Sequence, residues 1–451
     1  MGNVHGLARP PRLVSASTAL ALSLLFIVVY GLTGWITSVR ADVGTWVFDW
    51  ERRLLFVPSL VLPYMSLDLF FVAAPFLCAT RRELGVFRRR MTTAILVAGA
   101  MFLLVPLQFA FPRPPAAGWT AAMFELLYGF DRACNLFPSL HVAILMLLAG
   151  IYHRHSRGIM RWLIHGWFSL IGLSTVLIYQ HHVIDVAGGF ALGVLCYYLI
   201  PERTTSRRPV INARIGIWYA TGAMILAVIA ASVRPWGLLL VWPAASMTIV
   251  ASAYFGLHVD LTRKEGGQLP LTARVVLTPW LLGQQASLLY YRRQASPWNV
   301  VAPNVWIGRQ LNERKAAEAR SLGAAAVLDL TSEFTEAASF LAPPYLNIPI
   351  LDLTAPTAND LQVAIYFINA HREAGAVYVH CKIGYSRSAA VIGAWLIDAG
   401  LAATPGEAIA MIRTARPSLI VRPEALASLD AFSRRSVAIN SLAPSLIEVR
   451  A

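Results

Sequence analysis

Long apolar runs fill the first 256 residues of the chain. Eight of them are candidates for membrane spans, because a helix needs about 20 apolar residues to cross the hydrocarbon core of a bilayer. These runs cover residues 16–37, 54–79, 91–111, 138–152, 160–180, 183–200, 215–233 and 236–256. The first run has no small-residue cleavage site behind a brief apolar core, so we expect it to be retained. The pattern predicts a polytopic α-helical membrane domain over residues 1–256.

Basic residues alternate with these runs in a regular way. They gather before the first run and after the second, fourth, sixth and eighth, at Arg9, Arg12, Arg81, Arg82, Arg88, Arg89, Arg90, Arg154, Arg157, Arg161, Arg203, Arg207, Arg208, Arg214, Arg263 and Lys264. Because cytoplasmic loops are enriched in Lys and Arg, the alternation predicts a multi-pass protein with both termini in the cytoplasm. The same bias accounts for the net charge of +14, so we do not expect nucleic acid as a partner.

The pattern changes from Asn304 onward, where short apolar stretches alternate with helical ones. Residues 325–330, 345–350 and 376–379 are expected to be strands, and residues 360–374, 389–398 and 406–415 are expected to be helices. Strands that alternate with helices are typical of a mostly parallel sheet. We therefore predict a soluble α/β domain over residues 300–440, followed by a tail at 441–451.

A mixed segment, residues 257–299, connects the two parts. Its stretch 275–291 is apolar enough to suggest a ninth span, but it is short and contains Pro279 and Gly283. An interfacial amphipathic or re-entrant segment is therefore favoured. A true ninth span would move the soluble domain to the outer side, and the pattern alone leaves that alternative open.

Composition agrees with this division. Hydrophobic residues make up 57% of the chain and charged residues 14%, whereas soluble domains carry about 25% charged residues. A wholly soluble protein is therefore excluded. The four cysteines form no Cys-x-x-Cys pair, so neither a zinc site nor a disulfide framework is indicated.

Three polar clusters fall at the outer face of the predicted topology. Arg113 follows the third run, Ser139 and His141 open the fourth, and His181 and Asp185 lie between the fifth and the sixth. Asp185 stands four residues after His181, so it could orient the imidazole and stabilise its cation. His181 is then a candidate nucleophile toward phosphorus and His141 a candidate acid for the leaving oxygen. Arg113 and Ser139 would bind the phosphate.

These clusters resemble the three motifs of the type 2 phosphatidic acid phosphatase superfamily. Arg113-Pro114 matches the end of the first motif, Pro138-Ser139-Leu140-His141 the second, and Ser174-Thr175 with His181 and Asp185 the third. Pro106 and Thr175 replace two cations of the family, which brings the chain closer to the sphingomyelin and inositol-phosphorylceramide synthase branch. The resemblance implies phosphate hydrolysis or transfer of a lipid headgroup at the outer face.

A separate motif lies in the soluble domain. It is the run Val379-His380-Cys381-Lys382-Ile383-Gly384-Tyr385-Ser386-Arg387-Ser388. It follows a predicted strand and precedes a predicted helix, so its backbone N–H groups would cradle an anion and favour the Cys381 thiolate. Arg387 could return to the phosphate that Cys381 attacks, Gly384 permits the tight path, and Ser388 could donate to the sulfur. Lys382, Ile383, Gly384, Tyr385 and Ser386 complete the predicted phosphate-binding loop.

The run resembles the Cys-x5-Arg motif of the cysteine phosphatases, and particularly their dual-specificity branch. The resemblance implies a general acid about thirty residues before the cysteine, and Asp352 occupies that place. Asp360 is the runner-up, but an acid at that position suits the start of the next helix. Residues 351–396 are similar to the mitochondrial phosphatases of phosphatidylglycerophosphate, which suggests a lipid substrate.

We therefore expect two phosphate-chemistry sites on opposite faces of a membrane, each passing through a covalent phospho-enzyme and neither needing a metal or another cofactor. The resemblances together point to a fusion found in bacterial inner membranes. The favoured substrate is a phospholipid or lipid-linked phosphate. A membrane-anchored phosphatase of phosphoproteins, an outer-face headgroup transferase and a non-catalytic scaffold remain as alternatives.

Overall fold

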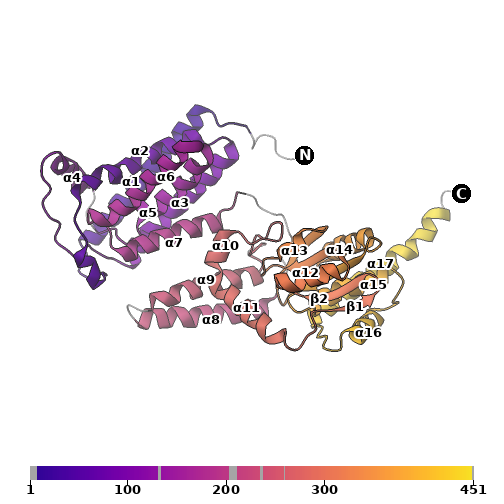
Figure 1. The fold of residues 1–451 in the computed structure, drawn as a ribbon. Helices are drawn as coiled ribbons and strands as arrows, with labels where there is room; N and C mark the ends of the chain where they lie inside the picture. Colours follow the sequence, from indigo (N-terminus) through magenta and orange to yellow (C-terminus); the bar gives the residue numbers. More distant parts are fainter. Residues whose placement is uncertain (1–7, 131–133, 203–210, 234–236, 258–259, 449–451) are drawn as a thin grey trace. The chain divides into compact units, whose positions relative to one another are not determined.

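The computed structural model describes residues 8–130, 134–202, 211–233, 237–257 and 260–448 (Figure 1). The chain divides into two compact units, Met1–Thr204 and Thr205–Ala451. The last two predicted spans therefore belong to the same unit as the α/β domain. Arg203, Arg207 and Arg208 of the predicted basic loop, and residues 449–451 of the predicted tail, lie outside the described residues.

The first unit is helical. Its helices are α1 (Arg12–Ser38), α2 (Val61–Leu77), α3 (Arg81–Leu104), α4 (Trp119–Phe130), α5 (Leu140–His155), α6 (Gly158–Leu177) and α7 (Val183–Leu199), with short 3-10 turns η2 (Asp49–Arg53) and η3 (Pro58–Leu60). Local capping sets two helix starts, because the Thr80 and Ser139 side chains accept hydrogen bonds from the N–H groups of Glu83 and Val142. Apolar side chains of α2, α3 and α5 form the core, among them Leu67, Met91 and Leu148.

Three helices among the described residues are long and apolar enough to cross a membrane: Arg12–Ser38, Pro58–Leu77 and Ala213–Ser232. Val183–Leu199 and Leu239–Tyr254 are apolar but shorter. The prediction of eight spans is thus supported for three. The apolar runs do not translate directly into spanning helices: α3 begins with an arginine-rich stretch, and α5 has 16 residues and ends in His153-Arg154-His155.

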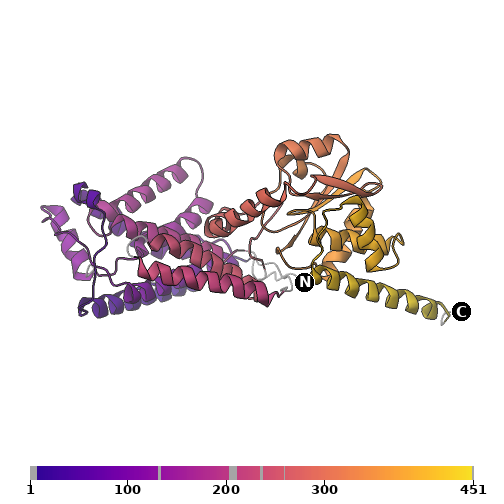
Figure 2. The same ribbon diagram turned by 90° about the horizontal axis from the view of Figure 1, so that it is seen from below.

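The second unit begins with a helical hairpin. Helices α8 (Ala213–Ser232) and α9 (Leu238–Tyr254) lie side by side in both views (Figures 1 and 2). The connector that follows forms α10 (Leu271–Val276) and α11 (Thr278–Tyr291). Pro279 lies in the first turn of α11, where a missing N–H costs nothing, so it begins this helix. The 14 residues of α11 span only about 21 Å, which is short of a bilayer core.

A five-stranded mixed sheet with the order β1-β2-β5-β3-β4 organises the rest of the unit. Its strands are β1 (Trp298–Ala302), β2 (Val305–Arg309), β3 (Ala324–Thr331), β4 (Tyr345–Ile350) and β5 (Ala376–Cys381). β1 pairs antiparallel with β2, and the other neighbours pair in parallel. The three predicted strands are thus present, and the hairpin β1–β2 adds an antiparallel edge that the sequence pattern did not predict.

Helices cover both faces of this sheet. They are α12 (Glu313–Ser321), α13 (Ala338–Leu341), α14 (Ala358–His371), α15 (Ser386–Asp398), α16 (Pro405–Ala415) and α17 (Pro423–Glu448). The alternation along β5 separates the two cores: Val379 and Cys381 belong to the cluster with α14 and α15, while Tyr378 packs with residues of α12 and α13. Cys381 and His380 therefore face opposite sides of the sheet.

Candidate functional site

Cys381 ends the central strand β5, and α15 begins five residues later at Ser386. In an open α/β sheet, ligands bind at the carboxyl ends of the parallel strands. The loop between strand and helix turns sharply at Gly384, whose φ is +73°. A Cβ on Gly384 would lie 2.4 Å from the Gly308 carbonyl oxygen, so only glycine fits this turn. The predicted strand–loop–helix context of Cys381 is present.

The surroundings of Cys381 favour its thiolate. The side chain is 3% exposed, and this burial alone would raise the pKa of the thiol. The Arg387 guanidinium, the Ser388 hydroxyl and the N–H groups of Ser388 and Tyr385 outweigh burial and lower the pKa of Cys381 below its ordinary value. The reactive form is therefore stabilised by one cation and several hydrogen-bond donors.

Arg387 returns from the first turn of α15 to the floor of the site. Its guanidinium donates to both carboxylate oxygens of Glu333, at 3.1 and 2.7 Å, and to the Ile350 carbonyl oxygen at 2.8 Å. It also donates to Oδ1 of Asp352 at 3.0 Å. Glu333 fixes the orientation of the arginine by this bidentate pairing. Glu333 is not among the residues expected from the sequence, because nothing in its local spacing distinguishes it from other acids after β3.

Asp352 follows the end of β4 and lies beside two cations. It pairs with Arg387 and, through Oδ2, with the ammonium of Lys382. Burial would raise the pKa of Asp352, but Arg387 and Lys382 outweigh it and hold the pKa below its ordinary value. Asp360 lies in a capping box with Thr357 at the start of α14, so it has a local structural partner.

The remaining predicted loop residues also lie around Cys381. Lys382 donates to Oε1 of Gln284 in α11 at 3.0 Å, and the hydroxyl of Ser386 donates to the Ile420 carbonyl oxygen at 3.1 Å. A cavity of about 600 Å³ opens over the loop, and its lining includes Cys381, Lys382, Ile383, Tyr385, Ser386, Arg387 and Asp352. The structure thus brings the predicted nucleophile, arginine and acid to one cavity.

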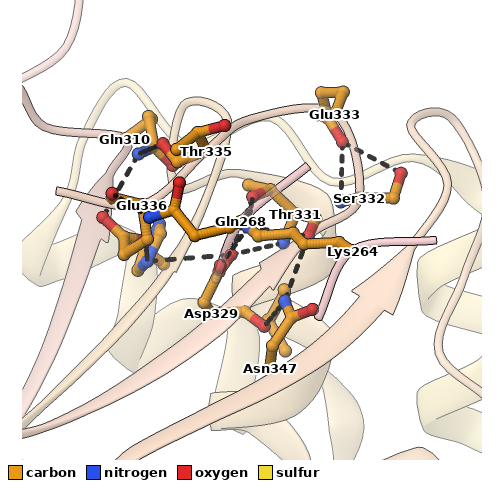
Figure 3. A network of polar contacts seen from close by, with 12 residues as sticks. Lys264, Gln268, Gln310, Asp329, Thr331, Ser332, Glu333, Thr335, Glu336 and Asn347 are labelled. Atoms are coloured by element: carbon orange, nitrogen blue, oxygen red, sulfur yellow. Dashed lines mark hydrogen bonds and ion pairs between the residues drawn. The ribbon is translucent and has the colours of Figure 1, made fainter. Parts of the chain in front are cut away.

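A buried charge cluster with Lys264, Asp329 and Glu336 lies on the opposite face of the sheet (Figure 3), and His380 contacts its carboxylates. Nε2 of His380 lies 3.0 Å from Oε2 of Glu336, and Lys264 pairs with Asp329. Burial would lower the pKa of His380, but Glu336 and Asp329 raise it above its ordinary value. Asp329, Glu336 and His380 have the spacing of metal ligands. Lys264 already pairs with Asp329, and His380 lies against Glu336, however, so this donor set favours an ion-pair network over a metal site.

The predicted outer cluster lies within the first unit. The rings of His141 and His181 are 6.4 Å apart, and Nδ1 of His181 lies 3.8 Å from Oδ2 of Asp185. The Ser139 N–H donates to the Asp185 carbonyl oxygen at 2.9 Å, which holds the starts of α5 and α7 together. His141 stacks on Tyr64, with 4.1 Å between ring centroids. His141, His181, Asp185 and Ser139 are thus neighbours.

Arg113 and His182 complete this region. Arg113 donates to the Tyr179 carbonyl oxygen and to Oε1 of Gln180, both at 3.0 Å, so it is anchored to the segment that carries His181. Nδ1 of His182 lies 3.2 Å from Oε2 of Glu51. Glu51 is not among the residues expected from the sequence, because it lies in a 3-10 turn far from every motif.

Comparison with known proteins concerns the second unit. Residues 305–435 match the family model of the dual specificity phosphatase catalytic domain. Phosphatidylglycerophosphatase and protein-tyrosine phosphatase 1 of Homo sapiens is 36% identical over 95 residues, which are 21% of this chain and 47% of that protein. Phosphatidylglycerophosphate phosphatase PTPMT2 of Arabidopsis thaliana is 29% identical over 144 residues, 30% of this chain and 63% of that protein. The chain spans about half the length of the human relative.

Solved structures match about a third of the chain. The crystal structure of Tk-PTP in the active form is 26% identical and covers 31% of this chain and 97% of that chain, with a TM-score of 0.29. The crystal structure of PTPMT1 in complex with PI(5)P is 22% identical and covers 32% and 99%, with a TM-score of 0.30. Residues 305–435 are thus similar to the catalytic domain of the dual specificity phosphatases, and both curated relatives are named as phosphatases.

Proposed function

We propose that the second unit hydrolyses lipid phosphomonoesters through a cysteinyl-phosphate intermediate. The observation that carries this proposal is the convergence of two separate segments on one cavity: the loop that carries Cys381 and Arg387, and the segment after β4 that carries Asp352. Cys381 is the nucleophile, Arg387 and the loop amides bind the phosphate oxygens, and Asp352 is the general acid. Lys382 adds a second cation for the phosphate.

In the first step the Cys381 sulfur attacks phosphorus while the bond to the ester oxygen breaks. The leaving alkoxide takes the proton of Asp352, so the alcohol departs neutral. In the second step water attacks the phosphocysteine, Asp352 accepts a proton from it, and the sulfur leaves as a thiolate. Ser388 and the loop amides stabilise that thiolate, because they already lower the pKa of Cys381. Arg387 compensates the charge of the transferring group in both steps.

A lipid substrate is supported by two observations. The relatives carry phosphatidylglycerophosphate phosphatase in their names, and the chain contains three candidate membrane spans. We place the domain on the cytoplasmic side of a multi-pass protein of a bacterial inner membrane, with both termini cytoplasmic. The human relative is also named as a protein-tyrosine phosphatase, so a phosphoprotein is the competing substrate.

The decisive experiment offers both substrates to the full chain in lipid nanodiscs. Phosphate release is measured from phosphatidylglycerophosphate in the disc and from a soluble phosphotyrosyl peptide. We expect the lipid to have the higher kcat/KM, and Cys381→Ser to abolish both activities. A higher kcat/KM for the peptide would refute the lipid assignment, and unchanged release by Cys381→Ser would refute the proposed chemistry.

A second candidate function concerns the first unit. The approach of the His141 and His181 rings beside Asp185 supports an outer-face site for phosphate hydrolysis or headgroup transfer, with a phosphohistidine at His181. Arg113 and Ser139 would bind the phosphate there. The test is made in a Cys381→Ser background, where lipid products are followed by mass spectrometry. His141→Ala and His181→Ala should abolish the remaining lipid conversion. His153→Ala is the control, because His153 is exposed, and it should retain the conversion. Equal conversion by all three variants would exclude this site.

A further inference from the structure

The cavity above Cys381 has a second wall that does not belong to the phosphatase domain. Tyr219 of α8, Pro243 and Met247 of α9, and Trp280 and Gly283 of α11 line it. All five residues precede the family match at 305–435. One end of the cavity therefore carries the cysteine, the arginine and the acid, and the other end is formed by mostly apolar side chains of three helices.

Specific hydrogen bonds attach this wall to the catalytic machinery. The Tyr254 hydroxyl donates to the Asp352 carbonyl oxygen at 2.7 Å, and the Asn212 amide donates to the Leu353 carbonyl oxygen at 2.8 Å. Asn212 immediately precedes α8 and Tyr254 ends α9, so both lie at the end of the α8–α9 hairpin nearest the site. Within the wall, Nε1 of Trp280 donates to the Tyr219 hydroxyl at 3.1 Å. The helices are thus fixed against the segment that carries the proposed general acid.

The hairpin also presents an apolar surface away from the cavity. On α8, the side chains of Trp218, Met224 and Val228 are 68%, 66% and 58% exposed within the structure. Helix α8 is one of the three candidate spans. Such a surface is stable in a bilayer and unfavourable in water. The wall of the cavity is therefore built in part from a helix suited to hydrocarbon, and the polar end of the cavity holds the phosphate-binding loop.

We propose that Met247, Trp280 and the face of α11 at Gly283 form a subsite for the acyl-glycerol portion of the lipid whose phosphate is cleaved at Cys381. This assignment rests on the proposed function and extends it to the recognition of the substrate. The phosphate is bound by the loop, and the glycerol and the first part of the acyl chains lie against α9 and α11. A lipid can then be hydrolysed without leaving its bilayer.

Gly283 offers the sharpest test. It lines the cavity, and a Cβ at this position would meet nothing within 4 Å. Gly283→Leu should therefore fold, with improved helix propensity, while its side chain occupies the subsite. Leu282→Ala is the matched control, because Leu282 is 64% exposed on the same helix and is not part of the cavity lining.

The measurement compares kcat/KM for dioleoyl phosphatidylglycerophosphate in nanodiscs with kcat/KM for p-nitrophenyl phosphate. In Gly283→Leu the kcat/KM for the lipid, divided by that for p-nitrophenyl phosphate, should fall by about tenfold or more. The leucine side chain would displace apolar contact area between the lipid and the subsite. Trp280→Ala should lower the same ratio by removing contact instead of adding bulk. Leu282→Ala should leave the ratio unchanged.

An unchanged ratio in both Gly283→Leu and Trp280→Ala would overturn the subsite. A parallel loss of both activities would also overturn it, because that result indicates a structural role. Failure of the proposed function gives a different result: the unaltered chain would then hydrolyse p-nitrophenyl phosphate and release no phosphate from the lipid.

Discussion

At the scale of single residues, the position of Asp352 between Arg387 and Lys382 determines the pH dependence of the proposed reaction. The two cations hold the pKa of this carboxyl below its ordinary value, which favours its ionised form. A phosphate dianion bound by the same cations would compensate their charge and raise the affinity of Asp352 for a proton. Substrate binding and protonation of the general acid are thus coupled.

Asp352→Asn should lower kcat for a lipid phosphomonoester by about 100-fold or more, because an alkoxide needs a proton to leave. The loss should be smaller for p-nitrophenyl phosphate, whose leaving group is stable as an anion. The unaltered chain should lose activity as the pH rises through the pKa of bound Asp352, and Asp352→Asn should lack this basic limb. Asp360→Asn, at the cap of α14, is the control and should keep the full pH–rate profile.

Lys264 supports the fold from the opposite face of the sheet. Its ammonium donates to Asp329 and, at 3.1 Å, to the hydroxyl of Thr331. Lys264→Met should lower the free energy of unfolding by about 3 kcal/mol, because it leaves a buried carboxylate without its partner. Thermal unfolding in detergent measures this loss. Lys315→Met, which removes a half-exposed pair with Glu318, should cost less than about 1 kcal/mol.

The same pair gives a pH dependence with a defined sign. Burial would raise the pKa of Asp329, but Lys264 and His380 outweigh it and hold the pKa below 3.8. A depressed folded-state pKa contributes stability above the ordinary value and loses it as the pH falls through the folded-state value. The free energy of unfolding should therefore decrease in acid below about pH 4. A steeper decrease in Lys264→Met than in the unaltered chain would contradict the proposed role of the Lys264–Asp329 pair.

Sequence could locate some of these residues and not others for a physical reason. Cys381 and Arg387 share one loop, so their separation is fixed by local chain geometry and can be read directly. Glu333, which orients Arg387, comes from another strand end, and Lys264 comes from the connector. Such partners are brought together by the tertiary fold, partly through sheet register, as where Asp329 lies beside His380, and a single sequence does not encode these long-range contacts locally.

At the scale of elements, the turn between β5 and α15 is tightly constrained at Gly384. Gly384→Ala would place a Cβ against the Gly308 carbonyl at a positive φ. The loop must shift, and we expect kcat to fall by about 100-fold, as for a misplacement of about 1 Å. Gly400→Ala shares the positive φ but meets nothing within 4 Å, so it should cost about 1 kcal/mol and leave kcat intact. Equal kcat values in the two variants would contradict the proposed loop geometry.

The elements differ in how far their sequences predict them. Strands β3, β4 and β5 are recognisable because buried parallel strands are nearly continuous apolar runs. Strands β1 and β2 escaped prediction because the edge hairpin mixes Trp298, Asn299 and Arg309 with apolar residues. Pro279 looked like a helix breaker, yet at the first turn of α11 it is compatible with the helix.

At the scale of the whole molecule, the family match covers only part of the compact unit in which it lies. It begins at residue 305, but Lys264 is buried in the sheet domain and the α8–α11 segment belongs to the same compact unit. The apolar runs suggested a division at residue 256, because periodicity distinguishes membrane-like from soluble sequence and does not reveal which parts pack together. The connector is therefore a structural component of the catalytic domain as well as a link.

Two fragments in the same detergent would measure this contribution. A fragment of residues 260–448 retains Lys264, whereas a fragment of residues 296–448 leaves Asp329, Glu336 and His380 buried with one cation fewer. The shorter fragment should melt about 6–12 °C lower, which corresponds to about 3 kcal/mol in a domain of this size. Lys264→Met in the longer fragment should reproduce most of that difference, because the ion pair and not the extra chain length is its cause. If the two fragments had the same melting temperature, Lys264 would be dispensable and the catalytic domain would be complete without its connector.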